Sequence, residues 1–300
     1  MTHRQDAFAL VAPTLAVVVS LTAGCLDMEN QDEVASDRLE VTSSNRISSN
    51  RISSNRISSN RISSNRISSN SLAADMATLG DLVETDGGRE YLSYLIRCAL
   101  PAGLDLVVLA SDGVTESYRF ARLIGLAPDW ETRALTLGEQ RWLSACMLAH
   151  VNAFGVSVPI SLRGPHPALQ SINNDEKQDF PVKEAAFYGN LFEDVDGDGL
   201  ADPFMYACHG KAKPKYADSE YLQRRICADA DPDSNGLTQC DFVAVGDCGT
   251  DSGAAEWACE MTGNNKTGYQ SCWSQVRTSA TSWPSTAEQH EEVITVFLMQ

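Results

Sequence analysis

Apolar residues recur three or four positions apart in residues 89–100 and in residues 139–153, which predicts two amphipathic helices. The apolar positions on these two faces are Leu92, Leu95, Ile96, Ala99, Trp142, Cys146, Ala149 and Ala153. Pro101 ends the first run, because proline cannot continue a helical hydrogen-bond ladder.

Shorter apolar segments predict strands. Residues 104–109 and 114–120 flank the turn Ser111-Asp112-Gly113 and predict a β-hairpin. Residues 156–162 and 292–298 are expected to form two more strands. After Asp175 the segments shorten, and cysteine, glycine and aspartate become dense. No repeating strand–helix–strand pattern is present, so the fold class predicted is α+β, with helices plus antiparallel strands and a disulfide-stapled, cysteine-rich C-terminal half.

Residues 1–24 have the character of a signal peptide: a short start containing Arg4, an apolar stretch over residues 7–21, and Ala23-Gly24 directly before Cys25. This segment resembles the lipobox of bacterial lipoproteins. The resemblance implies that Cys25 is acylated and becomes the first residue after cleavage, which would anchor the protein to a membrane through lipid. It also implies a place in the cell envelope, and Leu26 after the cysteine favours the outer membrane or cell surface. The alternative is an ordinary secretory signal with an unmodified cysteine.

Residues 25–71 are expected to form a disordered tether. Five copies of Arg-Ile-Ser-Ser-Asn follow one another from Arg46 to Asn70. A period of five matches neither helix nor strand, and one isoleucine per five residues buries too little surface to offset the entropy of ordering. A pentapeptide-repeat β-helix is the alternative, but it would have too few coils to stack.

The chain of 300 residues has a formal net charge of −17, with 23 Lys+Arg against 40 Asp+Glu. All of this negative charge lies in residues 71–300, because the acidic residues 25–45 and the basic repeats cancel. Such a body is unsuited to nucleic acid, which needs a basic face. No apolar run after the signal segment is long enough to span a membrane as a helix.

Nine cysteines are present, and setting Cys25 aside leaves an even number, which in an exported chain predicts four disulfides. The eight are Cys98, Cys146, Cys208, Cys227, Cys240, Cys248, Cys259 and Cys272. Cys98 and Cys146 each lie on an apolar helix face and are expected to pair, leaving the other six to pair among themselves. The spacing of a zinc site is absent.

An acidic loop is the clearest metal-site pattern. Asp194, Asp196, Asp198 and Asp202 occupy loop positions 1, 3, 5 and 9, with Gly199 at position 6. This pattern resembles calcium loops of the DxDxDG type and predicts Ca²⁺ as a cofactor, although Met205 replaces the glutamate that an EF-hand has at position 12. An ordinary acidic surface turn is the alternative. Residues 231–236 repeat the start of the pattern less completely.

Catalytic motifs are weak. Gly249-Thr-Asp-Ser-Gly253 echoes the nucleophile loop of trypsin-like proteases but lacks its flanking glycine and proline. His166 and His209 are loop histidines that could act as bases or could serve only as capping or solvated groups. Trp257, Trp273 and Trp283 could line a glycan groove or simply pack around disulfides. The sequence therefore assigns no catalytic residue and favours a protein that is not an enzyme.

Several segments resemble uncharacterised lipoproteins of myxobacteria and their relatives, many of which carry a Ser-Ser-Asn repeat stalk. The segments that carry the resemblance are Cys98-Ala-Leu-Pro101, Gly125-Leu-Ala-Pro-Asp-Trp130, Gln140-Arg-Trp-Leu-Ser-Ala-Cys146 with Asn152, Phe187-Tyr-Gly-Asn-Leu-Phe192, and Cys208. The resemblance implies an envelope lipoprotein and no particular activity.

Together these patterns divide the chain into a signal peptide over residues 1–24, a tether over residues 25–71 and one disulfide-rich α+β domain over residues 72–300, with a candidate sub-boundary near residues 165–175. The function expected is a non-catalytic surface module that binds a glycan or another protein. The alternative is a secreted hydrolase with an unfamiliar site, which a polar cleft holding His166 or His209 beside a carboxylate would favour.

Overall fold

The computed structural model describes residues 51–52, 67–111, 117–152, 154, 157–193, 204–210, 220–223, 225, 236–249, 255–261, 267–277 and 282–300. The chain divides into two compact units, Met1–Asp37 and Arg38–Gln300, and every described residue belongs to the second.

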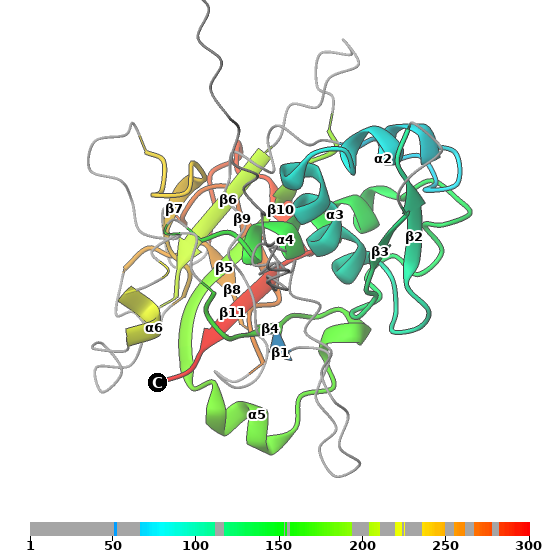
Figure 1. Cartoon of the computed structure of the whole chain (residues 1–300). Helices are drawn as coiled ribbons and strands as arrows, with labels where there is room; N and C mark the ends of the chain where they lie inside the picture. The colour runs from blue at the N-terminus through cyan, green and yellow to red at the C-terminus, as the bar shows by residue number, and fades with distance from the viewer. Residues whose placement is uncertain are drawn as a thin grey trace, which may run out of the picture. The chain divides into compact units, whose positions relative to one another are not determined.

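A six-stranded sheet forms the centre of this unit, in the order β1-β4-β11-β5-β6-β7 (Figure 1). Its strands are β1 (Arg51–Ile52), β4 (Ile160–Arg163), β5 (Val182–Asn190), β6 (Phe204–His209), β7 (Val243–Asp247) and β11 (Ile294–Leu298). The strands pair antiparallel except for β6 and β7, which run parallel. Strands from both sides of residues 165–175 therefore share one sheet.

Two smaller sheets accompany it. The three-stranded sheet has the order β10-β9-β8, and the two-stranded sheet is a hairpin of β2 and β3. The strands are β2 (Leu106–Leu109), β3 (Ser117–Phe120), β8 (Cys259–Glu260), β9 (Ser271–Trp273) and β10 (Gln289–His290). The hairpin predicted from the sequence is confirmed, with Leu106 opposite Phe120 and Leu109 opposite Ser117.

The helices are α2 (Met76–Leu82), α3 (Asp86–Ala99), α4 (Leu137–Ala149), α5 (Asn174–Asp179) and α6 (Glu220–Gln223), with a 3-10 turn η1 (Pro167–Leu169). Together with the mixed sheets they confirm the predicted α+β class. Thr85 and Thr136 cap α3 and α4 by accepting hydrogen bonds from backbone N–H groups in the first turn. Helix α4 ends at Ala149, four residues before the expected Ala153, and the His150 ring Nδ1 lies 2.7 Å from the carbonyl oxygen of Cys146.

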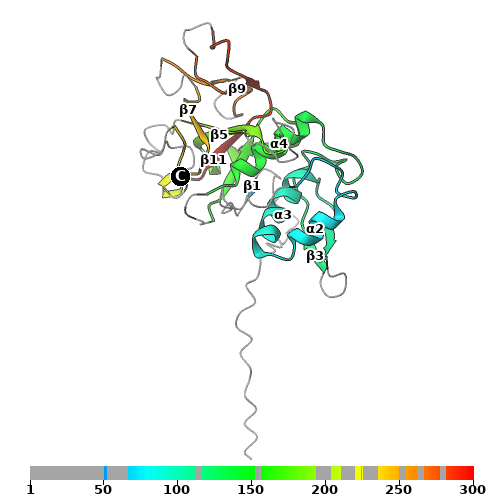
Figure 2. The ribbon, with the colours of Figure 1, turned by 90° about the horizontal axis from the view of Figure 1, so that it is seen from above.

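The central strand β5 is buried along its whole length because both faces of the sheet are covered. Ala185 and Phe187 belong to the larger core, which includes the buried faces of α3 and α4. Ala186 and Tyr188 point to the other face, where they form a second core with the three-stranded sheet. Figure 2 shows α4 and β9 on either side of β5 and β11. The unit is thus layered: helices, central sheet, small sheet.

The folded unit begins before the Leu72 expected as its start. Ile67, in the fifth repeat, is 6% exposed and belongs to the larger core. The Ser69 carbonyl accepts a hydrogen bond from Leu135 N at 2.8 Å, and the Asn70 carbonyl accepts one from the Trp130 indole at 2.7 Å. The last repeat is therefore built into the body, and β1, in the second repeat, pairs with β4 at the edge of the sheet.

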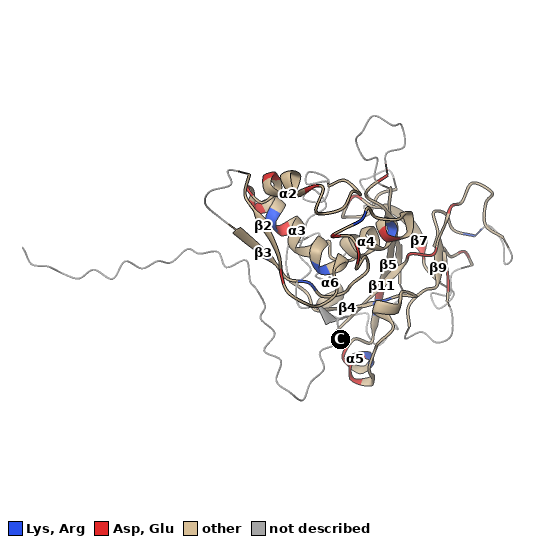
Figure 3. Cartoon of the chain, turned by 90° about the vertical axis from the view of Figure 1, so that its right-hand side faces the viewer, with Lys and Arg blue, Asp and Glu red and all other residues tan. Residues whose placement is uncertain are grey.

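Charged side chains are spread over this unit. Acidic residues lie on α2, α3 and α5 and near β9 (Figure 3), so the negative charge is distributed over several elements. None of the described helices has the length and hydropathy needed to cross a bilayer.

Candidate functional site

The best candidate for a binding site is a half-open cleft of about 360 Å³ between the β4–α5 connection and the segment that leads into β9. It is called the β4–β9 cleft below. Its lining residues are Gly164, Pro165, Leu169, Gln170, Ile172, Thr267, Gly268, Tyr269 and Gln270. Small-molecule sites are usually concave, mostly apolar and supplied with a few polar groups, and this volume is within their range.

Two glycines fix the floor of the cleft against the main sheet. A β-carbon on Gly164 would lie 2.5 Å from the carbonyl oxygen of Val293, so no larger residue fits there. Gly268 has a φ of 86° and would place a β-carbon 2.8 Å from Thr295 Oγ1. The backbone at Gly164 therefore packs directly against Val293, just before β11, and the backbone at Gly268 packs directly against Thr295 on β11.

The wall that leads into β9 is held by further contacts. Tyr269 N donates to Thr295 Oγ1 at 2.9 Å, and Gln270 N donates to the Glu260 carbonyl at 2.8 Å. Two residues further on, Cys272 is bonded to Cys259, its partner across the β8–β9 pair. This wall is therefore fixed to both sheets.

The opposite wall is shaped by the η1 turn. His166 caps η1 by accepting a hydrogen bond from Ala168 N at 3.1 Å, and its ring packs edge-on against Trp142 at 5.0 Å. Burial lowers the pKa of His166, so the ring is neutral and suited to accept that bond. Gln170 Nε2 donates to the Pro165 carbonyl at 3.0 Å, which orients the amide at the cleft.

A buried polar network supports the sheet end below the cleft. Arg163 donates to Ser161 Oγ at 3.0 Å and to the Phe180 carbonyl at 3.0 Å, and it lies 3.8 Å from the Phe297 ring centroid. Ser161 Oγ in turn donates to Glu176 Oε1 at 2.6 Å. Burial lowers the pKa of Arg163 to about 10, which leaves it cationic at neutral pH. The network stabilises the strand from which Gly164 follows.

Charge is absent from the described lining of the cleft, although the chain as a whole carries −17. Glutamine amides and the threonine hydroxyl both donate and accept hydrogen bonds, and the proline, leucine and isoleucine supply apolar surface. This arrangement suits a neutral ligand with many hydroxyl groups more than an ion.

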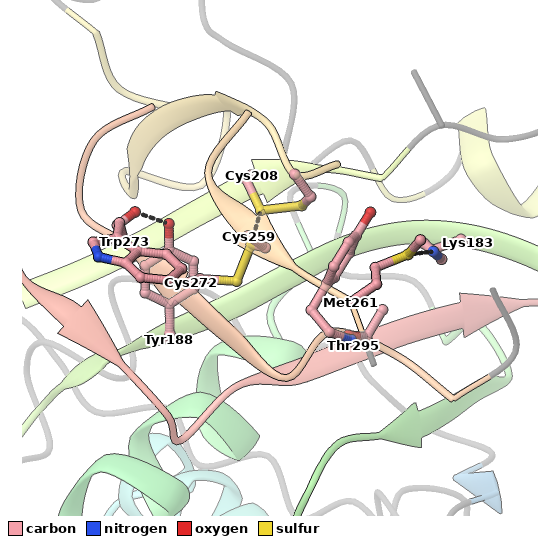
Figure 4. Close-up of a disulfide and its surroundings, with 10 residues drawn as sticks. Lys183, Tyr188, Cys208, Cys259, Met261, Cys272, Trp273 and Thr295 are labelled. Carbon is pink, nitrogen blue, oxygen red and sulfur yellow. Dashed lines mark hydrogen bonds between the residues drawn. A yellow bond between two sulfur atoms is a disulfide. The ribbon is translucent and has the colours of Figure 1, made fainter. Parts of the chain in front are cut away.

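The second core contains two disulfides in contact. Cys208 is bonded to Cys248, Cys259 is bonded to Cys272, and the sulfurs of Cys208 and Cys259 are 3.3 Å apart (Figure 4). In the same view Tyr188 donates to the Trp273 carbonyl, and the Lys183 ammonium lies beside the Met261 sulfur. This cluster joins the three-stranded sheet to β5 and β6.

The predicted cysteine pairing is confirmed where the structure describes it. Cys98 is bonded to Cys146, which joins α3 to α4. Cys240 is also disulfide-bonded, and its partner lies outside the described residues, as does Cys227. Two groups of cysteines, one of them with His150, have metal-ligand spacing among the described residues, but these cysteines are in disulfides and offer no thiolate.

Three sets of predicted site residues fall outside the described part of the chain. These are the lipidation residue Cys25, the calcium ligands Asp194, Asp196, Asp198 and Asp202, and the serine and aspartate of the protease-like Gly249–Gly253 segment. Calcium binding and acylation therefore stay predictions.

The candidate histidines do not come together. His166 caps η1 beyond the end of β4, whereas His209 lies at the end of β6, and β11 and β5 separate these strands. Glu139 is the carboxylate whose charge acts on the pKa of His166. It is already bound by Arg133, at 2.6 Å, and by Thr136 in the capping box of α4. The described residues show no histidine–carboxylate pair lining the cleft.

The three tryptophans are linked by one ring stack and by Arg277. Trp273 and Trp283 are parallel with ring centroids 3.5 Å apart. Arg277 lies between Trp283, at 4.4 Å, and Trp257, at 4.6 Å. Arg277 and Trp273 therefore both pack against Trp283, beside the β9–β10 pair.

The cleft residues were not found from the sequence. Gln170 and Gln270 are one hundred positions apart and belong to no motif. The only available signals were Gly164 beside Pro165 and the position of Gly268 before a short strand, which indicate turns rather than a site. Comparison with protein families, with curated proteins and with solved structures finds no match to this chain.

Proposed function

We propose that this protein is a cell-envelope lipoprotein whose disulfide-bonded body binds a neutral glycan in the β4–β9 cleft without transforming it. The observation that carries the ligand is the uncharged, amide- and hydroxyl-bearing lining of a cleft in a chain of net charge −17. A polyhydroxylated ligand requires donors and acceptors side by side, and an anionic ligand would be repelled by the surrounding acidic body.

Export and anchoring rest on separate support. The lipobox-like segment before Cys25 and the repeat stalk favour a lipid-tethered envelope protein, in line with the resemblance to myxobacterial lipoproteins. The disulfides of the body favour an oxidising compartment. Attachment would be through acyl chains at Cys25, on the outer membrane or cell surface.

Absence of catalysis is proposed because the described lining of the cleft contains no histidine and no carboxylate. His166 accepts a backbone hydrogen bond, and His150 is fully buried with its pKa lowered to about 3 by burial. Neither is among the residues that line the cleft. The alternative, a hydrolase with an unfamiliar site, predicts turnover of the bound glycan and is separated by the experiment below.

The ligand is tested by calorimetry on the full, membrane-extracted chain in detergent. The probes are neutral oligosaccharides (cello-, malto- and N-acetylglucosamine oligomers) and an acidic one, oligogalacturonate. We expect a neutral oligomer to bind and the acidic one not to. The double variant Gln170→Ala/Gln270→Ala should weaken binding about 10- to 30-fold, since each lost hydrogen bond contributes on the order of 1 kcal/mol.

The matched control is Gln178→Ala, an exposed glutamine on α5 that does not line the cleft. Its affinity should equal that of the parent chain. Failure of every neutral probe at millimolar concentration, or binding of the acidic probe alone, overturns the assignment of a neutral glycan as the ligand. Release of new reducing ends during the titration overturns the non-catalytic assignment in favour of the hydrolase.

Anchoring is tested by the intact mass of the membrane-extracted protein, native and reduced. The mass should show cleavage before Cys25 with added acyl chains, and reduction should add two hydrogens for each of four disulfides. A product that still begins at Met1, without acyl mass, contradicts the lipoprotein proposal.

A further inference from the structure

The edge of the central sheet next to the tether has a specific occupant. Strand β4 pairs on one side with β11 and on the other with β1, where Arg51 lies opposite Ser161 and Ile52 opposite Ile160. Without β1, strand β4 would present unpaired backbone N–H and C=O groups at a sheet edge. Such an edge is a template for any strand that can approach it.

Residues Arg51 and Ile52 are one copy of a repeated unit. The dipeptide Arg-Ile occurs at the start of each of the five copies between Arg46 and Asn70, always followed by Ser-Ser-Asn. Edge pairing is made by the backbone, and the side chains on either side of the dipeptide are the same in every complete copy. Nothing in the local sequence therefore distinguishes the second copy from its neighbours as a partner for β4.

The number of residues between β4's partner copy and the buried Ile67 limits which copies can pair with β4. The fifth copy is committed to the body through Ile67, which is 6% exposed in the main core. With the second copy at the edge, fourteen residues (53–66) connect β1 to Ile67; the first copy would lengthen this connection and the third would shorten it to nine. Nine residues still span about 30 Å when extended.

We propose that β4 is a docking edge for the Arg-Ile-Ser-Ser-Asn repeats of this same chain, and that the first, second and third copies exchange at it in steps of five residues. Only one copy pairs with β4 at a time, and each alternative copy presents the same sequence to that edge. The number of tether residues that are not docked on the body then depends on which copy is paired with β4. Register degeneracy of this kind is expected where the sequence does not specify a single alignment.

The consequence for the tether rests on the proposed acylation of Cys25. With the second copy docked, 25 residues (26–50) lie between the anchor and the sheet; with the first, 20, and with the third, 30. Each exchange would change the number of residues between the anchor and the sheet by five.

Hydrogen exchange of the β4 backbone tests the proposal and does not depend on lipidation or on glycan binding. In the parent chain the edge amides of residues 160–163 should be protected. In Ile52→Pro, which removes one N–H and disfavours a strand, other copies should replace the second, and exchange should accelerate by less than about twofold. In the quadruple variant with proline at positions 47, 52, 57 and 62, it should accelerate about tenfold or more.

The matched control is the quadruple Ile→Val variant at the same four positions, which keeps every N–H and should exchange like the parent. None of these variants touches Ile67, and unchanged protection of α3 and α4 amides confirms an intact body in each. If Ile52→Pro alone exposes β4 as fully as the quadruple proline variant, the second copy docks uniquely and the exchange of copies is overturned. If the quadruple proline variant keeps β4 protected, the edge is not covered by the repeats.

Discussion

Gly164 and Val293 approach so closely that a β-carbon on the glycine would lie 2.5 Å from the valine carbonyl oxygen. The neighbour is backbone of the segment entering β11, which cannot turn aside as a flexible side chain could. Gly164→Ala should therefore destabilise the protein by roughly 2 kcal/mol or more and open the floor of the β4–β9 cleft. Urea unfolding followed by tryptophan fluorescence measures the first effect.

A control for this change is Gly103→Ala. There the nearest atom to a new β-carbon is the Pro101 carbonyl oxygen at 3.7 Å, an ordinary contact. The free energy of unfolding should change by no more than about 0.5 kcal/mol. Equal destabilisation by the two alanines would show that the close approach of Gly164 to Val293 is not the cause.

The disulfides should contribute unequally to stability. Cys98 and Cys146 are 48 positions apart, whereas Cys259 and Cys272 are 13 apart. The chain-entropy relation gives a stabilisation of about 4 kcal/mol for the first and about 3 kcal/mol for the second. The Cys98→Ala/Cys146→Ala variant should thus lose more free energy of unfolding than Cys259→Ala/Cys272→Ala, and the reverse order would contradict this account.

Stability should fall as the solution is acidified from pH 6.5 to about 4. Burial lowers the pKa of His290 to about 4, with Glu288 opposing and Arg141 adding to the shift, and burial lowers that of His150 to about 3. In this pH range these two histidines are protonated in the unfolded chain and remain neutral in the folded chain. The free energy of unfolding therefore decreases as pH falls. For His290 alone the loss amounts to roughly 3 kcal/mol between its unfolded pKa and pH 4.

The pH effect can be assigned with His290→Phe. The His290 ring packs against both Tyr188 and Tyr206, at 5.3 and 5.6 Å between ring centroids, and phenylalanine preserves a ring in that place without a titrating group. Denaturant unfolding at pH 7, 5.5 and 4.5 should show a shallower decline for the variant. An identical decline in both proteins would remove His290 from the explanation.

Calcium binding at Asp194, Asp196, Asp198 and Asp202 is tested by calorimetry with CaCl2 on the full chain. The alternating carboxylates are expected to bind in the range of extracellular calcium modules, and Asp196→Asn/Asp198→Asn should abolish that binding. A matched change is Asp175→Asn/Asp179→Asn on α5, which should leave it intact. Absence of binding below about 10 mM overturns the assignment.

Local sequence patterns predicted those elements whose partners are close in the chain. The stripe of Leu92, Leu95 and Ile96 gave α3, since each residue faces the core of its own helix layer. The β2–β3 hairpin followed from a short turn, and the pairing of Cys98 with Cys146 followed from two apolar helix faces. In each case a single periodicity or turn was enough.

Elements buried on two sides gave no such signal. Strand β5 (Val182–Asn190) carries apolar and polar residues without alternation, because Lys183 and Glu184 are buried in contacts from outside the strand. Lys183 lies beside Met261, and Glu184 accepts from Arg225 at 2.8 Å. These partners lie far along the chain, so a strand that depends on them cannot be read locally.

The same reason hid the cleft and the real start of the folded body. Gln170 and Gln270 reach one cleft through the pairing of β4 with β11 and the hydrogen bond from Tyr269 N to Thr295 Oγ1 on β11, which no short segment encodes. Ile67 has the same local sequence as Ile62 but is followed by Ser71 and Leu72 instead of another arginine. Only the contacts with Leu135 and Trp130 separate the fifth copy from the rest.

Because Ile67 is buried, the five repeats differ in how well they tolerate mutation although their sequences are identical. Slippage of the coding repeat that deletes or adds a unit leaves the last one seated against Trp130, because whichever unit remains adjacent to Ser71 inherits that place. Natural variants should thus differ freely in the number of units, while missense changes in the final one should be purged for folding reasons. A comparison of repeat sequences between natural isolates should therefore show substitutions in the earlier repeats and few or none in the last one.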